Sequence, residues 1–493
     1  MAISLKQNLN LADEKMLASS THILIVLATV STVKKMEKIP FLEALNSKLK
    51  RTHKKLEDLS KAPISLDLGM DLANGAMVSF VVLDTGLSAF KRHTLLRKAI
   101  KPLLDEAPQN LAIAVYGDDA AREQAAKDAF YVASVNAQDL PQRKGSKNQE
   151  KARLLKTIEL FGWQDKSGFA GIDALVEGNT LTRTLTMTPP NELTPALYRK
   201  QIAKLAEKEG WKLTEFDMKK LSKMGAGAFV AVAQGSEPQD AAIVHLSYTP
   251  KNAKKHIALV GKGICFDTGG HNLKPAKYMH GMHEDMNGSA VALGVLLAAT
   301  RAKLPIKIDC WLALAQNHIS PAAYKQNDVV TALNGTTIEI IHTDAEGRMV
   351  LADTLTLASR EKPEMMMDFA TLTGSMVSAL GDRYSGVLGN TPVLLCKAVG
   401  AGAQVGERVC MFPFDDDYDE DLESSIADIK QCTLEGGADH VHATRFLSKF
   451  IENDTPWLHV DLSSYNRKGG LGALASDVNG FGVALALNLI QAD

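Results

Sequence analysis

The sequence predicts an α/β protein with a small N-terminal α/β domain, a linker helix and a larger C-terminal α/β domain that has a mixed central sheet. Three observations predict this fold. Short apolar runs alternate with polar helical stretches along the chain, a rhythm typical of α/β proteins. An apolar-free stretch and the pair Pro189-Pro190 interrupt that rhythm. The length of 493 residues suits about two to four domains of roughly 150 residues each.

Residues 1–165 are predicted to form the smaller domain. Its apolar runs have the length of buried strands, and its helical stretches carry spaced apolar residues. In chain order we expect a strand at Ile23–Val30, a helix at Glu43–Leu59, strands at Met77–Leu83 and Leu111–Tyr116, a helix at Asp119–Phe130, a loop at Gln142–Gln149 and a strand or helix at Leu154–Phe161.

Residues 166–188 are predicted to form the linker, with a helix over Ala170–Met187 that stops where proline disfavours helix. Residues 189–493 are predicted to form the larger domain. Asn334-Gly335 predicts a tight hairpin turn between apolar runs at Asp328–Leu333 and Thr336–Ile341. The other expected elements are helices at Tyr198–Gly210, Ala290–Ala299 and Met349–Ser359, and buried strands at His256–Val260, Ile306–Ala315, Met367–Ala370 and Leu458–Leu462.

The composition excludes several classes of protein. With 45% apolar and 23% charged residues, the chain has the make-up of a soluble globular protein and not of a disordered or fibrous one. The five cysteines are at least fourteen positions apart, which excludes a C-x-x-C site and suits a reducing cytoplasm. The apolar run His22–Val30 is too short to cross a bilayer and follows the acidic pair Asp13 and Glu14, so we expect no membrane partner.

The charge is unevenly distributed along the chain. Residues 1–165 carry 24 Lys and Arg against 19 Asp and Glu, and the remainder carries 31 against 38. A basic cluster consists of five side chains within eight positions: Lys48, Lys50, Arg51, Lys54 and Lys55. The cluster suits either a nucleic-acid surface or a solvated helix face, and we favour the solvated face.

A glycine-rich segment, Gly261–Pro275, follows the expected strand at His256–Val260. It is not a nucleotide-binding loop, because its glycines do not fall as G-x-G-x-x-G and Lys262 is followed by glycine where a P-loop needs Ser or Thr. The segment instead offers Lys262 and Asp267 on tightly turning backbone at the end of a strand. Active sites of open α/β sheets form at such positions.

Three more acids lie at the ends of expected elements. Asp285 precedes an apolar helix, and Asp344 and Glu346 lie between a hairpin strand and the next helix. Together with Asp267 they would repel one another strongly, and cations would relieve that repulsion. Two divalent ions would balance four carboxylates. Oxygen-rich ligation without a cysteine pair favours Zn²⁺, Mn²⁺ or Mg²⁺ in a hydrolytic site.

The chemistry-bearing segments resemble the leucyl (cytosol) aminopeptidase family. The resemblance rests on the order and spacing of Val260–Gly270, Leu273-Lys274-Pro275, Asp285-Met286, the highly specific Thr343–Arg348 and Ala370–Gly374. It begins near Pro190–Pro195, continues through Ile426–Gly437 and passes Trp457–Asp461, which covers most of residues 170–493. It implies the family's fold, its two-metal peptidase activity and its homohexameric assembly.

The resemblance also implies a role for each matching residue. Asp267 and Glu346 would bridge two metal ions, Lys262 and Asp285 would complete the shell of one ion, and Asp344 would complete that of the other. Lys274 would polarise the scissile carbonyl, and Arg348 would hold a bicarbonate-like anion that shuttles a proton. The residues implied for the substrate cleft are Met282, Thr371, Leu372 and Gly374.

Several positions depart from the common family pattern. His342, His283, Glu284 and Asn287 replace more usual residues, and His271 lies in the glycine-rich segment. None of them is among the seven metal and catalytic positions. We therefore expect hydrolysis to be retained, and we expect His342 and His283 to be hydrogen-bonded or surface side chains in preference to metal ligands.

The leading hypothesis is a cytoplasmic two-metal aminopeptidase that removes apolar, leucine-like N-terminal residues from peptides with a free amine. The alternative is a nucleic-acid-binding regulator on the same scaffold, which would bind DNA tightly and in a salt-sensitive manner through the basic cluster. A degenerate, non-catalytic member is the third hypothesis. The seven matching functional positions argue against it.

Overall fold

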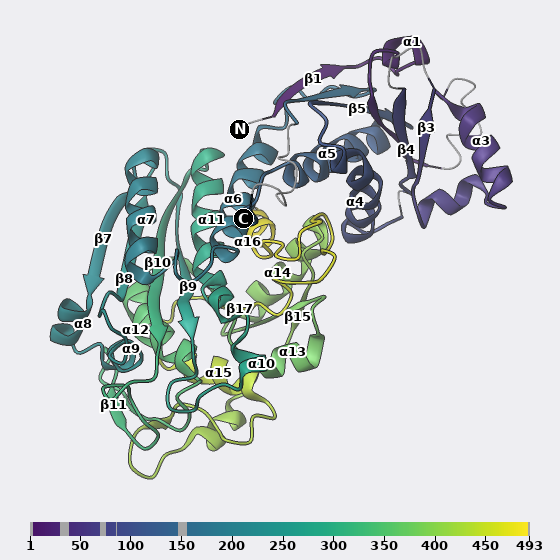
Figure 1. Cartoon of the computed structure of the whole chain (residues 1–493). Helices are drawn as coiled ribbons and strands as arrows, with labels where there is room; N and C mark the ends of the chain where they lie inside the picture. The colour runs from purple at the N-terminus through teal and green to yellow at the C-terminus, as the bar shows by residue number, and fades with distance from the viewer. Residues whose placement is uncertain (1–2, 30–38, 70–74, 85, 146–154, 492–493) are drawn as a thin grey trace. The chain divides into compact units, whose positions relative to one another are not determined.

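The computed structural model describes residues 3–29, 39–69, 75–84, 86–145 and 155–491 (Figure 1). The chain separates into two compact units. The first unit consists of Met1–Val176, Ala403–Gly406 and Lys468–Asn479, and the second consists of the remainder. Both units are α/β, as predicted. The domain boundaries after residues 165 and 188 stay predictions.

The first unit contains a six-stranded sheet in the order β1-β6-β5-β2-β4-β3. All neighbouring strands are parallel except β3, which runs antiparallel to β4. The strands are β1 (Ser4–Asn8), β2 (His22–Leu27), β3 (Ile64–Leu68), β4 (Ala76–Val82), β5 (Asn110–Tyr116) and β6 (Thr157–Phe161). The helices are α1 (Glu14–Leu17), α3 (Leu42–Arg51), η1 (Leu56–Ser60), α4 (Ala89–Asp105) and α5 (Asp119–Asn136).

The expected elements of this unit correspond closely to β2, β4, β5, β6 and α5. Three expected positions lie outside the described residues: part of the loop at Gln142–Gln149, Val30 at the end of an expected strand, and Leu154 at the start of the expected strand or helix. Helix α4 was not predicted. Its apolar residues alternate with basic ones in the sequence, so they do not form an obvious apolar stripe. Which of them are buried becomes evident only from the packing of the helix on the sheet.

The prediction of one helix over Glu43–Leu59 is wrong. Helix α3 ends at Arg51, and the 3₁₀ helix η1 begins at Leu56. The Thr52 hydroxyl donates to the Lys48 carbonyl oxygen at 2.9 Å, and His53 takes a left-handed φ of 52°, which terminates the helix. The basic cluster therefore lies on the last turn of α3 and the turn after it, where cations interact favourably with the helix dipole. A role of the cluster in nucleic-acid binding stays a prediction.

The second unit contains an eight-stranded sheet in the order β15-β14-β17-β13-β9-β10-β8-β7. The central strands β17, β13, β9 and β10 are parallel. Strand β14 runs antiparallel to β17 and parallel to β15, and β8 runs antiparallel to both β10 and β7. The predicted mixed sheet is thus confirmed. Its strands are β7 (Lys212–Asp217), β8 (Ala242–Tyr248), β9 (Lys255–Asp267), β10 (Ile306–Asn317), β13 (Met365–Ala370), β14 (Ser385–Gly389), β15 (Val409–Met411) and β17 (Trp457–Asp461).

Helices cover both faces of this sheet (Figure 1). The helices of the second unit and of the predicted linker are α6 (Ala170–Thr186), α7 (Pro195–Glu209), α8 (Met218–Met224), α9 (Gly227–Ala233), α10 (Ala276–Met279), η3 (Met282–Glu284), α11 (Asn287–Arg301), α12 (Glu346–Arg360), α13 (Gly374–Leu380), α14 (Pro392–Val405), η4 (Asp416–Leu422), α15 (Asp439–Ser448) and α16 (Val483–Gln491). No helix in these described ranges is both long and apolar enough to span a bilayer.

A small third sheet contains the predicted hairpin. Strands β11 (Val329–Thr331) and β12 (Thr337–Glu339) pair antiparallel, and β16 (Ile429–Lys430) joins β12 in parallel. Gly335 has a φ of +92° in the connecting turn, which a residue with a side chain rarely adopts. The Asn-Gly signal was therefore a correct guide to this turn.

The sequence suggested that the backbone turns from Gly261 onward, and this prediction is wrong. Strand β9 continues through it to Asp267, and β13 and β10 pair with it on either side. A Cβ at Gly261 would lie 2.5 Å from the Ser289 Cα of helix α11. The glycine is thus needed for the close approach of helix and strand.

A buried carboxylate makes the stability of the second unit depend on pH. Glu407 accepts hydrogen bonds from the amides of Gly482 and Leu485 at 2.9 and 2.8 Å. Burial raises the pKa of Glu407 from 4.5 to about 7. The native state therefore holds a proton that the unfolded chain releases at lower pH, so this group's contribution to stability is lost as the pH rises through that window.

We expect Glu407→Gln to become more stable relative to the parent when the pH is raised from about 5 to about 8, because the variant cannot acquire a buried charge. Thermal unfolding of both proteins at the two pH values measures this difference. Glu435→Gln, which changes an exposed glutamate, is the control. An equal difference in melting temperature at both pH values would contradict the prediction.

Candidate metal centre

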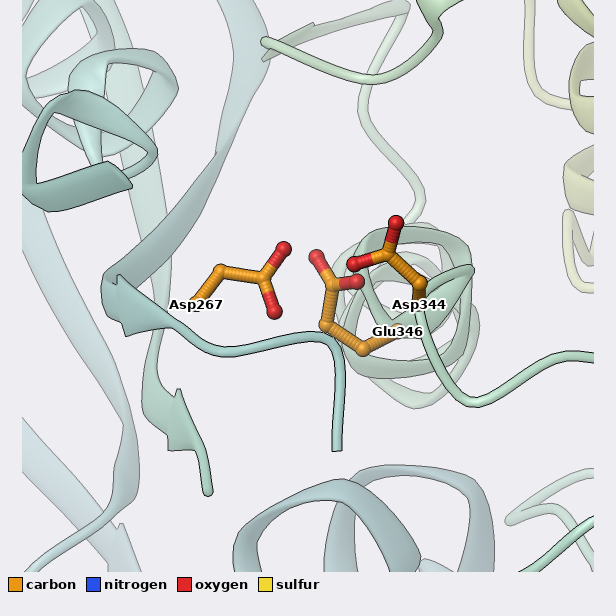
Figure 2. A group of neighbouring side chains, drawn as sticks. All are labelled: Asp267, Asp344 and Glu346. Atoms are coloured by element: carbon orange, nitrogen blue, oxygen red, sulfur yellow. The ribbon is translucent and has the colours of Figure 1, made fainter. Parts of the chain in front are cut away.

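Three carboxylates meet at the carboxyl edge of the eight-stranded sheet. Asp267 ends β9, Asp344 lies in the loop before α12, and Glu346 is in the first turn of α12. Figure 2 shows the three side chains pointing toward one another. One oxygen of each lies within 4.8 Å of the others, and they form the one such group of acid, histidine or cysteine side chains in the described residues. The structure thus groups three of the four acids that the sequence analysis expected to meet, and their role as metal ligands stays a prediction.

An irregularity in β9 places Lys262 and Asp267 on the same side of the sheet. In a regular strand, residues five apart point to opposite faces. Between the pairs Ala315↔Ile264 and Asn317↔Asp267, however, β9 advances three residues while β10 advances two. The extra residue is a β-bulge that restores the common face. The lysine and the carboxylate therefore project toward the same centre.

Lys262 lies between two of the acids. Its Nζ is 2.9 Å from Asp285 Oδ2 and 2.9 Å from Glu346 Oε1, and it donates to the Thr371 carbonyl oxygen at 2.9 Å. A Cβ at Gly347 would lie 2.7 Å from this nitrogen, so glycine leaves room for it. Burial alone would lower the pKa of Lys262, but the surrounding carboxylates raise it above the ordinary lysine value.

Lys274 lies on the other side of the acids. Its Nζ is 3.0 Å from Asp267 Oδ2 and 2.5 Å from Asp344 Oδ1. Burial opposes the charged form, but the carboxylates of Asp267, Glu346 and Asp344 raise the pKa of Lys274 above its usual value. The two lysines thus neutralise part of the acidic charge in the structure.

The ionised forms of the carboxylates are disfavoured even with the lysines present. Burial raises the pKa of Asp285 to about 8 and that of Asp344 to about 7, and it also raises the pKa of Glu346. Repulsion among the acids contributes to each shift. Additional positive charge would favour their ionised forms.

Unsatisfied oxygens indicate where that charge would fit. Among the described residues, the buried atoms without a well-directed hydrogen bond include Asp285 Oδ2, Asp344 Oδ1 and Glu346 Oε1. Each is within 2.9 Å of a lysine nitrogen, yet the direction is poor for hydrogen bonding. Apart from these ion pairs, the three oxygens have no hydrogen-bond donor among the described residues, and carboxylates that face one another fit divalent cations. The residues present therefore suit a metal centre.

Side chains that the sequence did not single out hold the acids in place. Asn317, at the end of β10, donates from Nδ2 to Asp267 Oδ1 at 2.9 Å and to the Thr343 carbonyl oxygen at 3.0 Å. The Tyr324 hydroxyl donates to the same carbonyl oxygen at 2.6 Å. The position of Asn317 at a strand end next to β9 was the available signal, but its role depends on the register between the two strands.

Arg348 is buried and already paired. Its Nη2 donates to Asp439 Oδ1 at 2.7 Å and its Nη1 donates to the Gln431 carbonyl oxygen at 3.1 Å. Its Nε is a further buried nitrogen that lacks a hydrogen bond within the described part of the chain. Asp439 thus competes for the guanidinium group that was expected to hold an anion.

Of the residues expected in the substrate cleft, Thr371 contacts the acidic centre. Its hydroxyl donates to Asp285 Oδ1 at 2.6 Å. Leu372 is half-buried on the same loop, and the exposed Gly374 opens α13. Met282 is half-buried in η3, three residues before Asp285. Thr371 thus contacts the acidic centre directly, and the other three residues lie within a few positions of Thr371 or Asp285 in the sequence.

The histidines that depart from the family pattern differ in environment. His342 accepts a hydrogen bond from the Asp344 amide through Nδ1 at 3.3 Å, and burial and Lys274 lower the pKa of this imidazole. His271 is exposed and donates from Nδ1 to the Tyr324 carbonyl oxygen at 3.0 Å. His283 is half-buried in η3. None of the three belongs to the group of neighbouring acids in the described structure.

An α/β fold whose mixed sheet carries buried acids and lysines at its carboxyl edge has the arrangement of a metal-dependent hydrolase. The description of the matching family profile is "Cytosol aminopeptidase family, catalytic domain", and the match covers residues 180–487. The chain belongs to the cytosol aminopeptidase family. The resemblance found in the sequence motifs is thereby confirmed.

Curated relatives support the same membership. A protein named "Probable cytosol aminopeptidase" from Corynebacterium glutamicum is 38% identical over 332 residues, which cover 67% of this chain and 66% of that protein. The protein of the same name from Stutzerimonas stutzeri is 43% identical, over 64% of this chain and 65% of its own. The protein of the same name from Sulfurihydrogenibium sp. is 33% identical, over 80% of this chain and 75% of its own length. The alignments span slightly under two thirds of the first two relatives.

A solved structure agrees with the fold over nearly the whole chain. The bottromycin maturation enzyme BotP in complex with Mn matches with a TM-score of 0.80 and 27% sequence identity. The match covers 96% of this chain and 99% of that chain. The similarity therefore extends over the N-terminal α/β part, which contains none of the sequence motifs that carry the family resemblance.

Proposed function

We propose that this protein is a two-metal aminopeptidase that removes apolar, leucine-like N-terminal residues from peptides. Family membership supports the activity, and the observation that carries the proposal is the group of buried, poorly satisfied carboxylate oxygens at the sheet edge. We propose Zn²⁺ or Mn²⁺ as the ions, with Mg²⁺ also suited to the oxygen ligands. The manganese complex of the structural relative supports Mn²⁺.

Five side chains would hold the two ions. Asp267 and Glu346 would bridge them, Lys262 and Asp285 would complete one shell, and Asp344 would complete the other. Bound divalent ions supply Lewis acidity, which polarises a carbonyl group and makes a water molecule nucleophilic near neutral pH.

Lys262 must be neutral to donate a lone pair. Its carboxylate neighbours favour the ammonium form, because each lies close to the nitrogen and is itself buried. Two dications would offset the charge of those carboxylates and repel a proton on the same nitrogen. Burial, which already opposes the charged form, would then decide the protonation state.

Lys274 and Arg348 would act on the substrate side. Lys274 would stay protonated and direct an N–H toward the oxygen that becomes negative as the carbonyl is attacked. Arg348 would bind a bicarbonate-like anion as a proton acceptor. Its Nε has no hydrogen-bond partner among the described residues, which supports this role. Asp439 would have to share the guanidinium group with that anion.

Peptides with a free N-terminus are the proposed substrates, because an unblocked amine can approach the acidic centre. Met282, Thr371, Leu372 and Gly374 would line the cleft, and the apolar Met282 and Leu372 suit a leucine-like side chain. On the strength of the family resemblance, the proposal includes a homohexamer in the cytoplasm.

We expect metal chelation to abolish hydrolysis of leucine anilide and re-addition of Mn²⁺ or Zn²⁺ to restore it. N-acetylated leucine anilide should be inert, because acetylation removes the amine that the centre binds. A spectrophotometric assay on both substrates measures these outcomes. Unchanged rates after chelation, or equal cleavage of the blocked substrate, would rule out the proposed function.

A further inference from the structure

Asp461 is a buried carboxylate next to the centre, and the sequence analysis gave it no role. It is the last residue of β17 and pairs in register with Ala370, the last residue of β13. Its exposed fraction is 1%. Oδ1 accepts a hydrogen bond from the Leu372 amide at 3.1 Å, and Oδ2 accepts one from the Thr373 hydroxyl at 2.7 Å. Asp461 thus anchors the loop that leaves β13.

The same loop holds two members of the acidic centre. The Thr371 carbonyl oxygen accepts a hydrogen bond from Lys262 Nζ at 2.9 Å, and the Thr371 hydroxyl donates to Asp285 Oδ1 at 2.6 Å. Three successive residues therefore connect the centre on one side with Asp461 on the other. A further bond, from the Leu462 amide to the Ala370 carbonyl oxygen at 2.7 Å, fixes the start of the loop.

We propose that Asp461 is a positioning residue that fixes Thr371–Thr373, so that Thr371 holds Lys262 and Asp285 in the geometry needed to bind a metal ion. The inference rests on the proposed function for its metal-binding role. Without the carboxylate, two donors of the loop lose a buried acceptor, and the loop can shift. Replacing a residue that orients a metal ligand in this way lowers metal affinity or activity by about 10- to 100-fold.

Asp353 provides a matched control. It is as deeply buried, in α12, and its carboxylate also accepts two backbone hydrogen bonds, from Phe229 and Leu333 at 2.8 Å each. These partners belong to α9 and to the hairpin, away from the loop after β13. Loss of Asp353 should therefore lower stability in a similar way without loosening Thr371.

The test compares Asp461→Ala, Asp461→Asn and Asp353→Ala with the parent in the full-length protein. Equilibrium dialysis against Mn²⁺ gives the metal affinity, thermal unfolding gives the stability, and leucine anilide hydrolysis at saturating Mn²⁺ gives kcat and KM. We expect Asp461→Ala to bind Mn²⁺ about 10- to 100-fold more weakly, with KM nearly unchanged once metal is saturating.

Asp461→Asn should restore most of the metal affinity, because its oxygen can accept from Leu372 and its amide can donate to the Thr373 hydroxyl. Asp353→Ala should lose stability but bind Mn²⁺ as the parent does. If Asp461→Ala does not fold, Thr373→Val, which removes one of the two anchoring bonds, should weaken Mn²⁺ binding in the same direction.

Parent-like Mn²⁺ affinity in the folded Asp461 or Thr373 variants, or an equal loss in Asp353→Ala, would overturn the inference. An inactive, metal-loaded parent would instead refute the proposed function. Because Mn²⁺ binding is measured independently of hydrolysis, the two failures are distinguishable.

Discussion

Replacing Glu346 or Asp267 with alanine is expected to lower peptide hydrolysis by roughly 10³-fold or more, on the scale of several kcal/mol of transition-state stabilisation that metal ions supply. Both carboxylates lie in the group of three whose oxygens come within 4.8 Å of one another. The loss of either would leave two dications with a single bridging ligand. Metal content should therefore fall together with activity, and elemental analysis measures it alongside the rate.

Two other acids serve as controls for this experiment. Asp139→Ala changes an exposed carboxylate in the first unit, and Asp353→Ala changes a buried one outside the centre. Both should retain their metal and most of their activity. If Asp267→Ala kept both ions, or if Asp139→Ala lost as much activity as Glu346→Ala, the acids would be wrongly assigned.

The second large effect is expected to separate the two lysines of the centre. Lys262→Ala removes a proposed ligand, so it should weaken metal binding, and excess metal should restore part of the activity. Lys274→Ala removes a cation directed at the developing oxyanion. It should keep both ions while kcat falls by something on the order of 10²- to 10³-fold, and added metal should not restore it.

Metal titration of each variant, followed by both elemental content and kcat, distinguishes the two roles. Each lysine lies within 3.0 Å of two carboxylates in the structure, so proximity to acids alone does not separate them. Metal loss in Lys274→Ala combined with metal retention in Lys262→Ala would reverse the proposed roles. The proposed aminopeptidase activity would not be contradicted by that result.

Much of the fold could be predicted because its elements carry local signals. The apolar runs of β5 and β10, the Asn-Gly turn and the helix before Pro189 are all evident from a few neighbouring residues. The break between α3 and η1 was missed because His53 adopts a left-handed conformation that the sequence around it does not indicate. The continuation of β9 through its glycines was missed because the reason for those glycines is the distant helix α11.

The candidate site divides in the same way. Asp267, Asp344 and Glu346 were identified from motif spacing, and the structure brings them together. The bulge that turns Lys262 and Asp267 to one face of β9 could not be predicted, because it depends on the register with β10. The sequence predicted no role for Asp461 or Asn317, for a related reason. Their importance lies in hydrogen bonds to loops 89 and 26 residues away in the chain.

Arg348 illustrates a different limit of the sequence. The motif Thr343–Arg348 includes this residue, but its partner Asp439 lies 91 residues further along. Only the folded chain reveals that the guanidinium group is already engaged. Its proposed role toward an anion therefore needs the structure as well as the motif.

The central claim is that these side chains hold two metal ions between Asp267 and Glu346. Anomalous diffraction from crystals of the parent protein grown with Mn²⁺ tests it most directly. The claim predicts two peaks per chain, both beside Asp267 and Glu346, with the Lys262 nitrogen bound to one of them and the Lys274 nitrogen bound to neither. A single peak, or peaks that these two carboxylates do not share, would contradict it.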